Sequence, residues 1–160
     1  TYHNVTIGLI GTKQTVGSEV YAKKIEGLGN GLKLHSLATP LLVPMIEEGF
    51  LEGTISQDII NEYLKKPLLQ NIQALILGCT HYPLIKEQVK YFYDGRVTVI
   101  DSSEMVAASL KAYLEYHLLI NTSAKAENEF MVSDYTSSFE ELTKLFFGSQ
   151  VHLKNHKLWE

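Results

Sequence analysis

One short stretch places a thiol, a hydroxyl and an imidazole on three consecutive residues. Cys79, Thr80 and His81 directly follow Gly78, and Cys79 is the single cysteine of the 160 residues. A thiolate needs polar neighbours that stabilise its charge, and an imidazole can take or give a proton near neutral pH. A lone cysteine is more often a small hydrophobe than a reactive group, but these neighbours favour proton transfer by Cys79 and His81.

The residues before this stretch predict a buried strand that positions it. Residues 74–77 are all apolar and lack the alternation of a half-exposed strand, which is typical of parallel sheets covered on both faces. Pro83 can open a helix at its first turn. Open α/β sheets hold their ligands at the carboxyl ends of the strands, so Cys79 is expected at such an edge.

A similar strand and turn occur near the start of the chain. The apolar residues 5–10 end at Gly11, and Thr12 and Thr15 then precede a helix expected over residues 16–28. One of the two threonines is expected to cap that helix. Hydroxyl groups beside a helix N-terminus can also bind a carboxylate. A third such turn contains Asp101, for which a capping role is sufficient.

The remaining pattern predicts an α/β fold in two parts. Residues 1–104 are expected to form a three-layer α/β/α lobe with a mainly parallel sheet. Residues 105–160 are expected to form an appendage of helix, strand and helix, with a polar connector over 121–128. The other expected elements are helices over 40–49, 56–69 with Ser56 as its cap, 84–92, 104–119 and 137–147, and strands over 33–37, 97–100, 129–132 and 150–153.

Composition excludes several classes of function. The formal charge of −4, without a stripe of Lys or Arg, gives no reason to expect a nucleic-acid partner. No apolar run approaches the length of a membrane span, and no Cys/His spacing of zinc type occurs. A single cysteine fits a reducing compartment, so a cytoplasmic protein is expected.

Residues 78–84, Gly-Cys-Thr-His-Tyr-Pro-Leu, resemble the second catalytic motif of the glutamate racemases. Gly11-Thr-Lys-Gln-Thr15, with Ser18, resembles a second motif of that family, Gly-Thr-x-x-Thr-x-x-Ser. The resemblance implies an isomerase that interconverts L- and D-glutamate for the supply of peptidoglycan precursors. It also implies that this reaction uses no cofactor.

The resemblance also implies roles for individual residues. Cys79 would be the base for L-glutamate, with His81 as a catalytic neighbour. Thr80 and His81, together with Thr12 and Thr15, would contact bound glutamate. Glu47, near the end of the helix expected over residues 40–49, would support the site from its mouth.

Only the later portion of the family's sequence is matched, although the match runs over essentially this whole chain. The earlier portion supplies the first catalytic cysteine, and residues 105–160 would return to its lobe. Inversion at Cα needs a base on one face and an acid on the other, so Cys79 alone serves one face. The chain alone is therefore expected to be inactive as a racemase. A homodimer and association with the N-terminal portion are both open, and an unpartnered strand over 129–132 would favour self-association.

Two other functions remain open from the sequence. One is a non-catalytic α/β module that binds an amino acid or regulates a partner, which the absence of the earlier portion favours. The other is a related aspartate-type racemase, which His81 and Pro83 disfavour.

Overall fold

The computed structural model describes residues 4–121, 128–149 and 151–157. The chain forms two compact units, Thr1–Lys111 and Ala112–Glu160. All the residues predicted for the site lie in the first unit.

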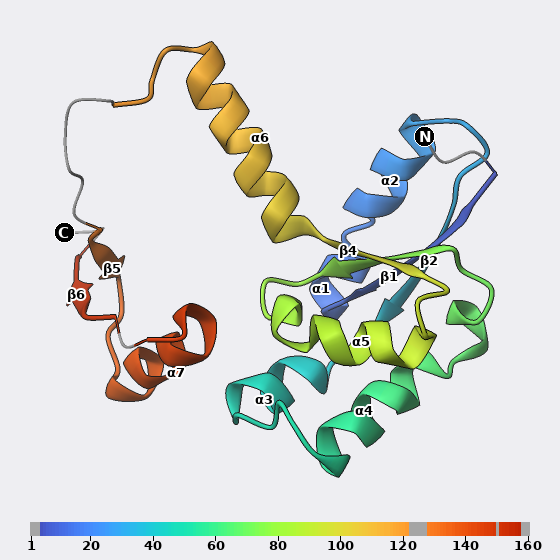
Figure 1. Ribbon diagram of the computed structural model, residues 1–160, viewed down its shortest axis with the longest axis horizontal. Coiled ribbons are helices and arrows are strands. Elements are labelled where there is room, and N and C mark those ends of the chain that lie inside the picture. The colour runs from blue at the N-terminus through green and yellow to red at the C-terminus, as the bar shows by residue number, and fades with distance from the viewer. Residues whose placement is uncertain (1–3, 122–127, 150, 158–160) are drawn as a thin grey trace. The chain divides into compact units, whose positions relative to one another are not determined.

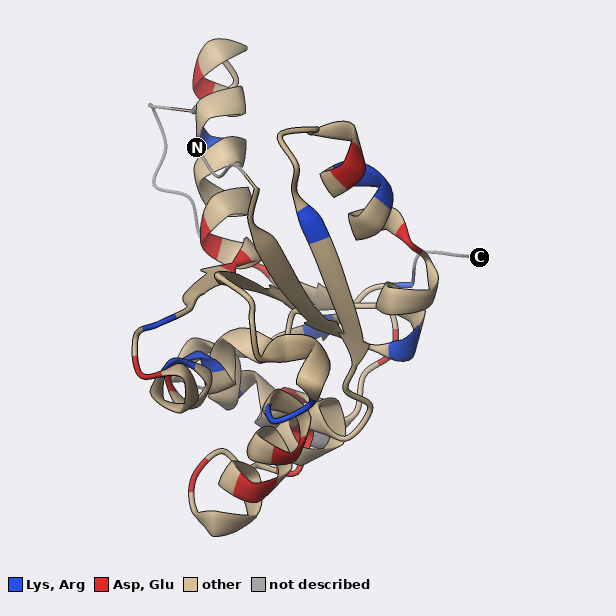
Figure 2. Cartoon of the chain, turned by 90° about the vertical axis from the view of Figure 1, so that its right-hand side faces the viewer, with Lys and Arg blue, Asp and Glu red and all other residues tan. Residues whose placement is uncertain are grey.

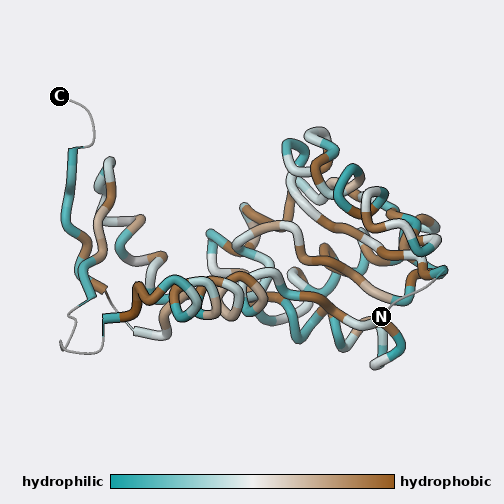
Figure 3. Tube along the Cα trace, turned by 90° about the horizontal axis from the view of Figure 1, so that it is seen from above, coloured by the Kyte–Doolittle hydropathy of each residue, from teal (hydrophilic) through white to brown (hydrophobic). Residues whose placement is uncertain are grey.

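The first unit is built on a four-stranded parallel sheet. Its strands are β1 (Thr6–Gly11), β2 (Lys33–Ala38), β3 (Ala74–Gly78) and β4 (Thr98–Asp101), in the order β2-β1-β3-β4. The central strands β1 and β3 are the most deeply buried. Figure 3 shows hydrophobic stretches running through the interior of the first unit. This sheet confirms the α/β fold with a mainly parallel sheet that the apolar runs predict.

Helices cover the sheet on both faces. The helices of the first unit are α1 (Lys13–Gly17), α2 (Val20–Gly27), α3 (Leu42–Glu47), α4 (Thr54–Leu64) and α5 (Lys86–Tyr93), with short 3₁₀ helices at Pro67–Leu69 (η1) and Tyr82–Ile85 (η2). Figure 1 shows α3, α4 and α5 together on one face and α2 on the other. The main core lies under α3, α4 and α5, where Ile46, Ile60 and Val89 are fully buried against Leu75 and Leu77.

Several predicted helices are shorter than expected, and the one expected over residues 40–49 covers only Leu42–Glu47. The helix expected over residues 16–28 is interrupted at Glu19, which has a left-handed backbone with φ 55°. Gly17 and Ser18 lower the helix propensity before it, and the Ser18 hydroxyl donates to the Thr15 carbonyl at the end of α1. The helix expected over residues 56–69 ends at Leu64, because Pro67 cannot continue it and opens a 3₁₀ turn.

Ser56 does not have the capping role that was predicted for it. The helix α4 begins at Thr54, and Gly53 is its N-cap with a φ of 98°. Ser56 is buried within the first turn, and its hydroxyl donates to the Gly53 carbonyl at 3.0 Å. It therefore closes the turn from inside the helix.

The second unit contains a small parallel ribbon and a helix. Helix α6 (Ser102–Tyr116) crosses the boundary between the units, and β5 (Phe130–Val132), α7 (Ser137–Phe147) and β6 (Leu153–Asn155) follow. The strand predicted over 129–132 is confirmed, but β6 pairs with it, so the expectation that both its edges are unpaired is wrong. The last strand begins three residues and ends two residues later than predicted, and most of the connector expected over 121–128 lies outside the described residues.

Charged residues lie mainly on the helices and loops. In Figure 2 the strands of the sheet are largely uncharged, whereas acidic and basic residues are spread over the helices and the connections between them. Within the described ranges, no helix is both long enough and apolar enough to cross a membrane.

Candidate functional site

The predicted site residues begin where two neighbouring strands end. Gly11 of β1 and Gly78 of β3 are paired in register, so Thr12 and Cys79 start their loops side by side. A methyl group added to Gly78 would lie 3.0 Å from the Ile10 carbonyl oxygen and 3.6 Å from Thr15 Cγ2. Glycine is therefore needed for the two strand ends to approach each other this closely.

Cys79, His81 and Glu47 form a connected chain of side chains. The Cys79 Sγ atom lies 3.8 Å from His81 Nδ1, and His81 Nε2 lies 3.0 Å from Glu47 Oε1. Thr80 adds its hydroxyl oxygen at 3.5 Å from the same His81 Nδ1. Glu47 reaches the ring from the last residue of α3, which is 34 positions away in the sequence.

The carboxylate fixes the orientation of the imidazole. An ionised Glu47 can only accept a hydrogen bond, so His81 Nε2 carries a proton and donates it. In the neutral ring, Nδ1 is then the acceptor, and it faces the Cys79 thiol. The side chain of His81 is 23% exposed and that of Glu47 45%, so water reaches the pair and screens its attraction. The arrangement can move a proton between the thiol and the ring.

Thr12 and Thr15 are joined to each other at the end of β1. Thr12 is the N-cap of α1, and its hydroxyl oxygen accepts from the Thr15 amide at 3.1 Å. The two hydroxyl oxygens lie 2.9 Å apart. The expected capping role is confirmed for Thr12. Thr15 lies in the first turn of α1, where its hydroxyl meets that of Thr12 and its methyl group faces Gly11 and Gly78.

Sequence reasoning missed a buried pair beneath the site, Thr39 and Tyr82. Thr39 immediately follows β2, and its hydroxyl oxygen lies 2.6 Å from the Tyr82 hydroxyl. Both side chains are fully buried. Burial raises the pKa of Tyr82 to about 12, partly offset by the hydrogen bond to Thr39. The position of Thr39 at a strand end was the available signal, since Thr12 and Cys79 occupy the same position after β1 and β3.

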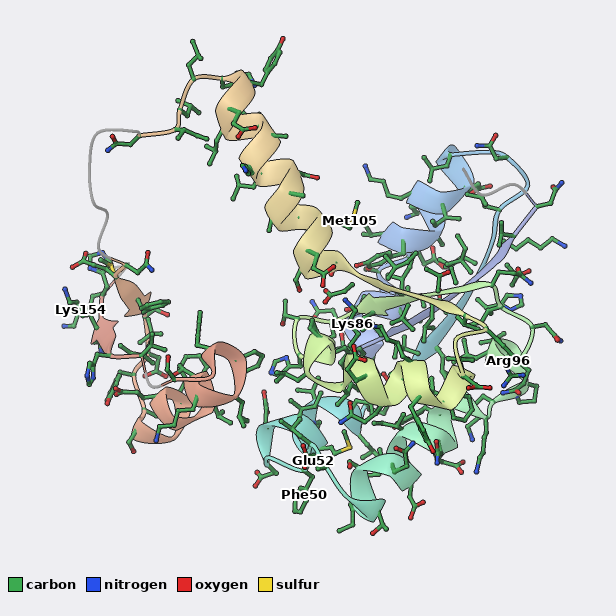
Figure 4. All side chains as sticks on the ribbon, in the orientation of Figure 1. Phe50, Glu52, Lys86, Arg96, Met105 and Lys154 are labelled. Atoms are coloured by element: carbon green, nitrogen blue, oxygen red, sulfur yellow. The ribbon has the colours of Figure 1, made fainter. Side chains whose placement is uncertain are left out.

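A partly buried ion pair lies at the end of β4. Lys86 Nζ lies 3.5 Å from Asp101 Oδ2 and 2.9 Å from Glu104 Oε1. Burial by itself would raise the pKa of Asp101, but the Ser103 amide and the Lys86 ammonium outweigh it and hold the pKa below its ordinary value. Figure 4 shows Lys86 and Arg96 at opposite ends of α5, so that Lys86 marks the carboxyl-end edge of the sheet. The capping role predicted for Asp101 agrees with its bond to the Ser103 amide at 2.8 Å.

Metal binding has no support in the part of the chain that the structure describes. Within those residues, no group of three or more His, Cys, Asp and Glu side chains could hold a metal ion.

Known proteins resemble this chain in sequence along most of its length. The glutamate racemase of Chlorobaculum parvum is 38% identical over 146 residues, which are 91% of this chain and 54% of that protein. The glutamate racemase of Persephonella marina is 37% identical over 158 residues, which are 99% of this chain and 58% of that protein. No protein-family model matches the chain.

Solved structures agree with the sequence comparison. The glutamate racemase of Francisella tularensis, solved in complex with D-glutamate, matches with a TM-score of 0.86 and 38% identity. That match covers 94% of this chain and 57% of the other chain. The glutamate racemase of Thermus thermophilus, solved with beta-chloro-D-alanine, matches with a TM-score of 0.83 and 29% identity over 96% of this chain and 57% of its own.

Over most of its own length, the chain is similar in sequence and in fold to the glutamate racemases. The resemblance read from residues 11–18 and 78–84 is thereby confirmed at the level of the family. The chain spans about half the length of the curated relatives it matches.

The fold assembles one group of predicted residues by direct contact and a second beside it. Cys79, Thr80, His81 and Glu47 are joined through the ring of His81, and Thr12 and Thr15 are joined to each other. Their roles toward glutamate remain predictions.

Proposed function

We propose that this chain supplies one proton-transferring thiol of a glutamate racemase. The observation that carries the proposal is the chain of contacts from Cys79 through His81 to Glu47 at the carboxyl ends of parallel strands. The relatives support the substrate, since the similar Francisella tularensis enzyme was solved with D-glutamate.

In the proposed reaction, Cys79 as thiolate removes the Cα proton of L-glutamate. The thiolate becomes a thiol, and the electron pair of the broken C–H bond remains on the substrate as a carbanion. A second acid then returns a proton to the opposite face, which gives D-glutamate. His81 helps to form the thiolate by accepting the thiol proton at Nδ1, with Glu47 balancing the charge of the ring. The proposed roles of His81 and Glu47 both follow from the orientation of the imidazole.

We further propose that hydroxyl groups at the same edge hold the carboxylates of glutamate. Thr12 and Thr15 lie at the end of β1, beside the strand that carries Cys79, and Thr80 is next to the thiol. Hydroxyl groups can donate to a carboxylate, which anchors the substrate while its Cα faces the thiol. Binding through these groups stabilises the carbanion only if they are already in place.

The acid for the opposite face is proposed to come from outside these residues. The sequence has a single cysteine, and the chain spans about half of its relatives. A second portion or a second copy would complete the site, so the chain alone is expected to exchange the Cα proton without inverting the centre. A free thiol is stable in a reducing compartment, which supports a cytoplasmic setting where D-glutamate enters peptidoglycan precursors.

The test is proton NMR of L-glutamate in heavy water with this chain, together with optical rotation. We expect the Cα proton signal to decay while the rotation stays constant. A Cys79→Ser chain should show no decay. Equal behaviour of the two chains would contradict the proposal. Decay accompanied by loss of rotation would contradict only the expectation that the chain alone cannot invert the Cα centre.

A second candidate is a non-catalytic module that binds an amino acid. In that case L-glutamate would slow the alkylation of Cys79 by iodoacetamide, but no Cα exchange would occur. An absence of both exchange and protection would contradict the racemase and the binding module together.

A further inference from the structure

Three strand ends are joined by buried polar groups just below the reactive side chains. The Gly11 carbonyl at the end of β1 accepts from the Thr39 amide at 2.9 Å and from the Thr39 hydroxyl at 3.2 Å. Thr39 follows β2, and its hydroxyl meets the Tyr82 hydroxyl, which belongs to the turn after β3. The Tyr82 hydroxyl also reaches the Thr39 carbonyl at 3.3 Å.

We propose that Tyr82 and Thr39 are positioning residues that hold the Cys79–His81 turn in its reactive geometry. The inference rests on the proposed function for its meaning, because it concerns the thiol that we assign to proton transfer. Neither side chain is proposed to touch glutamate, since both are fully buried.

The turn is held at both of its ends through Tyr82. The Tyr82 amide donates to the Cys79 carbonyl at 3.1 Å, which closes the turn that contains Thr80 and His81. The Tyr82 hydroxyl, at the far end of the ring, is fixed by Thr39. A shift of the ring would therefore move the backbone that sets the separation of 3.8 Å between Cys79 Sγ and His81 Nδ1.

Thr39 also connects the hydroxyl contact with Tyr82 to the helix that carries Glu47. Its carbonyl accepts from the Leu42 amide at 3.2 Å, and Leu42 is the first residue of α3. Glu47 is the last residue of that short helix and bonds to His81. One buried pair thus lies between the segment that carries the thiol and imidazole and the segment that carries the carboxylate.

Simple packing of the core does not require this pair. A buried polar group costs free energy unless it is bonded, and a phenylalanine with a valine would fill similar space without that cost. A tyrosine hydroxyl is protonated at neutral pH, and burial raises the pKa of Tyr82 further, to about 12, so this hydroxyl can act as a donor. A directional bond fixes the ring where apolar contacts would let it slide.

Tyr93 provides a matched control elsewhere in the same unit. It is also buried, burial also raises its pKa to about 12, and its hydroxyl donates to the Leu69 carbonyl at 3.4 Å. It lies beside Ile72 and Val97, which precede β3 and β4 at the amino ends of the strands. Tyr93→Phe therefore removes a comparable hydroxyl far from the turn of Cys79.

The experiment measures the rate of Cys79 alkylation by iodoacetamide at pH 7, with thermal unfolding of each chain. We expect Tyr82→Phe and Thr39→Val each to slow alkylation by about threefold or more, because the imidazole no longer lies correctly beside the thiol. The double variant should slow alkylation by less than the product of the two single effects, because both single variants remove the bond between the two hydroxyl groups.

Two variants keep the test specific. Thr39→Ser retains the hydroxyl and should restore the rate, and Tyr93→Phe should keep the rate while lowering the melting temperature. Equal alkylation rates for Tyr82→Phe and Tyr93→Phe would overturn the inference. Alkylation does not require glutamate, so a failure of Cα exchange in the wild-type chain would count against the proposed function and leave this result standing.

Discussion

The two edges of the parallel sheet use similar residues in different ways. At the amino ends of the strands, polar side chains bond to the backbone: Gln73 Oε1 accepts from the Thr6 amide at 2.7 Å, and Arg96 Nε donates to the Tyr93 carbonyl at 3.1 Å. At the carboxyl ends, side chains also bond to one another, as in the contact of His81 with Glu47. An edge of the first kind stabilises the fold, and an edge of the second kind brings titratable atoms together.

The difference follows from the direction of the strands. In a parallel sheet every strand delivers its next residue to the same edge, so loops from distant parts of the sequence meet there. Thr12, Thr39 and Cys79 each follow a strand at this edge. The amino ends are reached from helices and turns whose polar groups satisfy the backbone, which leaves fewer side chains for chemistry.

Replacement of His81, at the carboxyl-end edge, should give the largest loss of Cα exchange, whereas a replacement at the amino-end edge should give none. His81→Gln removes the proton acceptor beside Cys79, so we expect Cα exchange of L-glutamate to slow by about 100-fold. NMR in heavy water measures this rate. Gln73→Leu at the amino edge is the comparison, and it should lower stability without changing the exchange rate. Equal losses of exchange would show that the chemistry is not confined to the carboxyl edge.

Gly78 and Gly8 allow the carboxyl-end and amino-end edges of the sheet to be compared by matched substitutions. A methyl group on Gly78 would lie 2.7 Å from Leu9 Cδ1 and 3.0 Å from the Ile10 carbonyl oxygen, and one on Gly8 would lie 2.7 Å from Ile72 Cδ1. Overpacking of this kind lowers the free energy of unfolding by about 2 kcal/mol, so we expect such a loss in both Gly78→Ala and Gly8→Ala.

Only the first of these variants should also change the chemistry. Gly78→Ala pushes on the strand end that carries Cys79, so alkylation of the thiol and Cα exchange should both slow. Gly8→Ala presses on flexible side-chain ends near the amino edge, and both rates should stay at the wild-type value. Urea unfolding and alkylation on the same samples separate the two effects. A loss of thiol reactivity in Gly8→Ala would contradict the distinction between the edges.

Much of the carboxyl edge could be predicted from the sequence, because apolar runs that end in glycine identify parallel strands. The apolar residues 74–77 and 5–10 predicted the strands β3 and β1. The residues that follow these strands include Cys79 and Thr12, which were predicted for the site. The contact between His81 and Glu47 joins residues 34 positions apart and depends on where α3 packs, which no local pattern contains. The homologous family implied a supporting role for Glu47, and the fold supplied its partner.

Local predictions failed where one residue overrides a helical pattern. The apolar spacing over residues 16–28 is helical, yet Glu19 adopts a left-handed backbone and divides the segment. Thr39 and Tyr82 were missed because a buried hydroxyl pair has no signature in either stretch alone. Such pairs become visible only when the ends of two strands are brought together.

Glu47 and its neighbour Glu48 form the next test. Glu47 bonds to His81, whereas Glu48 is the exposed C-cap residue of α3. Glu47→Gln removes the charge that balances the imidazolium, and we expect Cα exchange to fall by about tenfold, since the pair is partly screened by water. Glu48→Gln should match the wild-type chain. A fall of the same size in both would mean that general charge near the site matters rather than the bond to His81.

The smallest expected effect concerns acid stability at the end of β4. The pKa of Asp101 is lowered in the folded chain, so its ionised form stabilises the fold above the ordinary aspartate range, and this contribution is lost as the pH falls through the lowered pKa. Asp101→Asn should therefore lower the free energy of unfolding at pH 7 by about 1 kcal/mol and flatten its decline below pH 5. Urea unfolding at several pH values measures both changes.

The matched control is Asp58→Asn, at an exposed aspartate of α4. It should leave the pH dependence of unfolding close to that of the wild-type chain. An Asp101→Asn chain with an unchanged acid profile would contradict the contribution assigned to the bonds with Lys86 and the Ser103 amide.

The central claim is that glutamate binds at the carboxyl-end edge of the sheet and not at the other. Titration of the ¹⁵N-labelled chain with L-glutamate, followed by amide chemical shifts, tests this directly. We predict shifts at Thr12, Thr15, Cys79 and His81, with the amides of Gln73 and Arg96 unchanged. Shifts at Gln73 and Arg96, or no shifts in residues 79–81, would contradict the account.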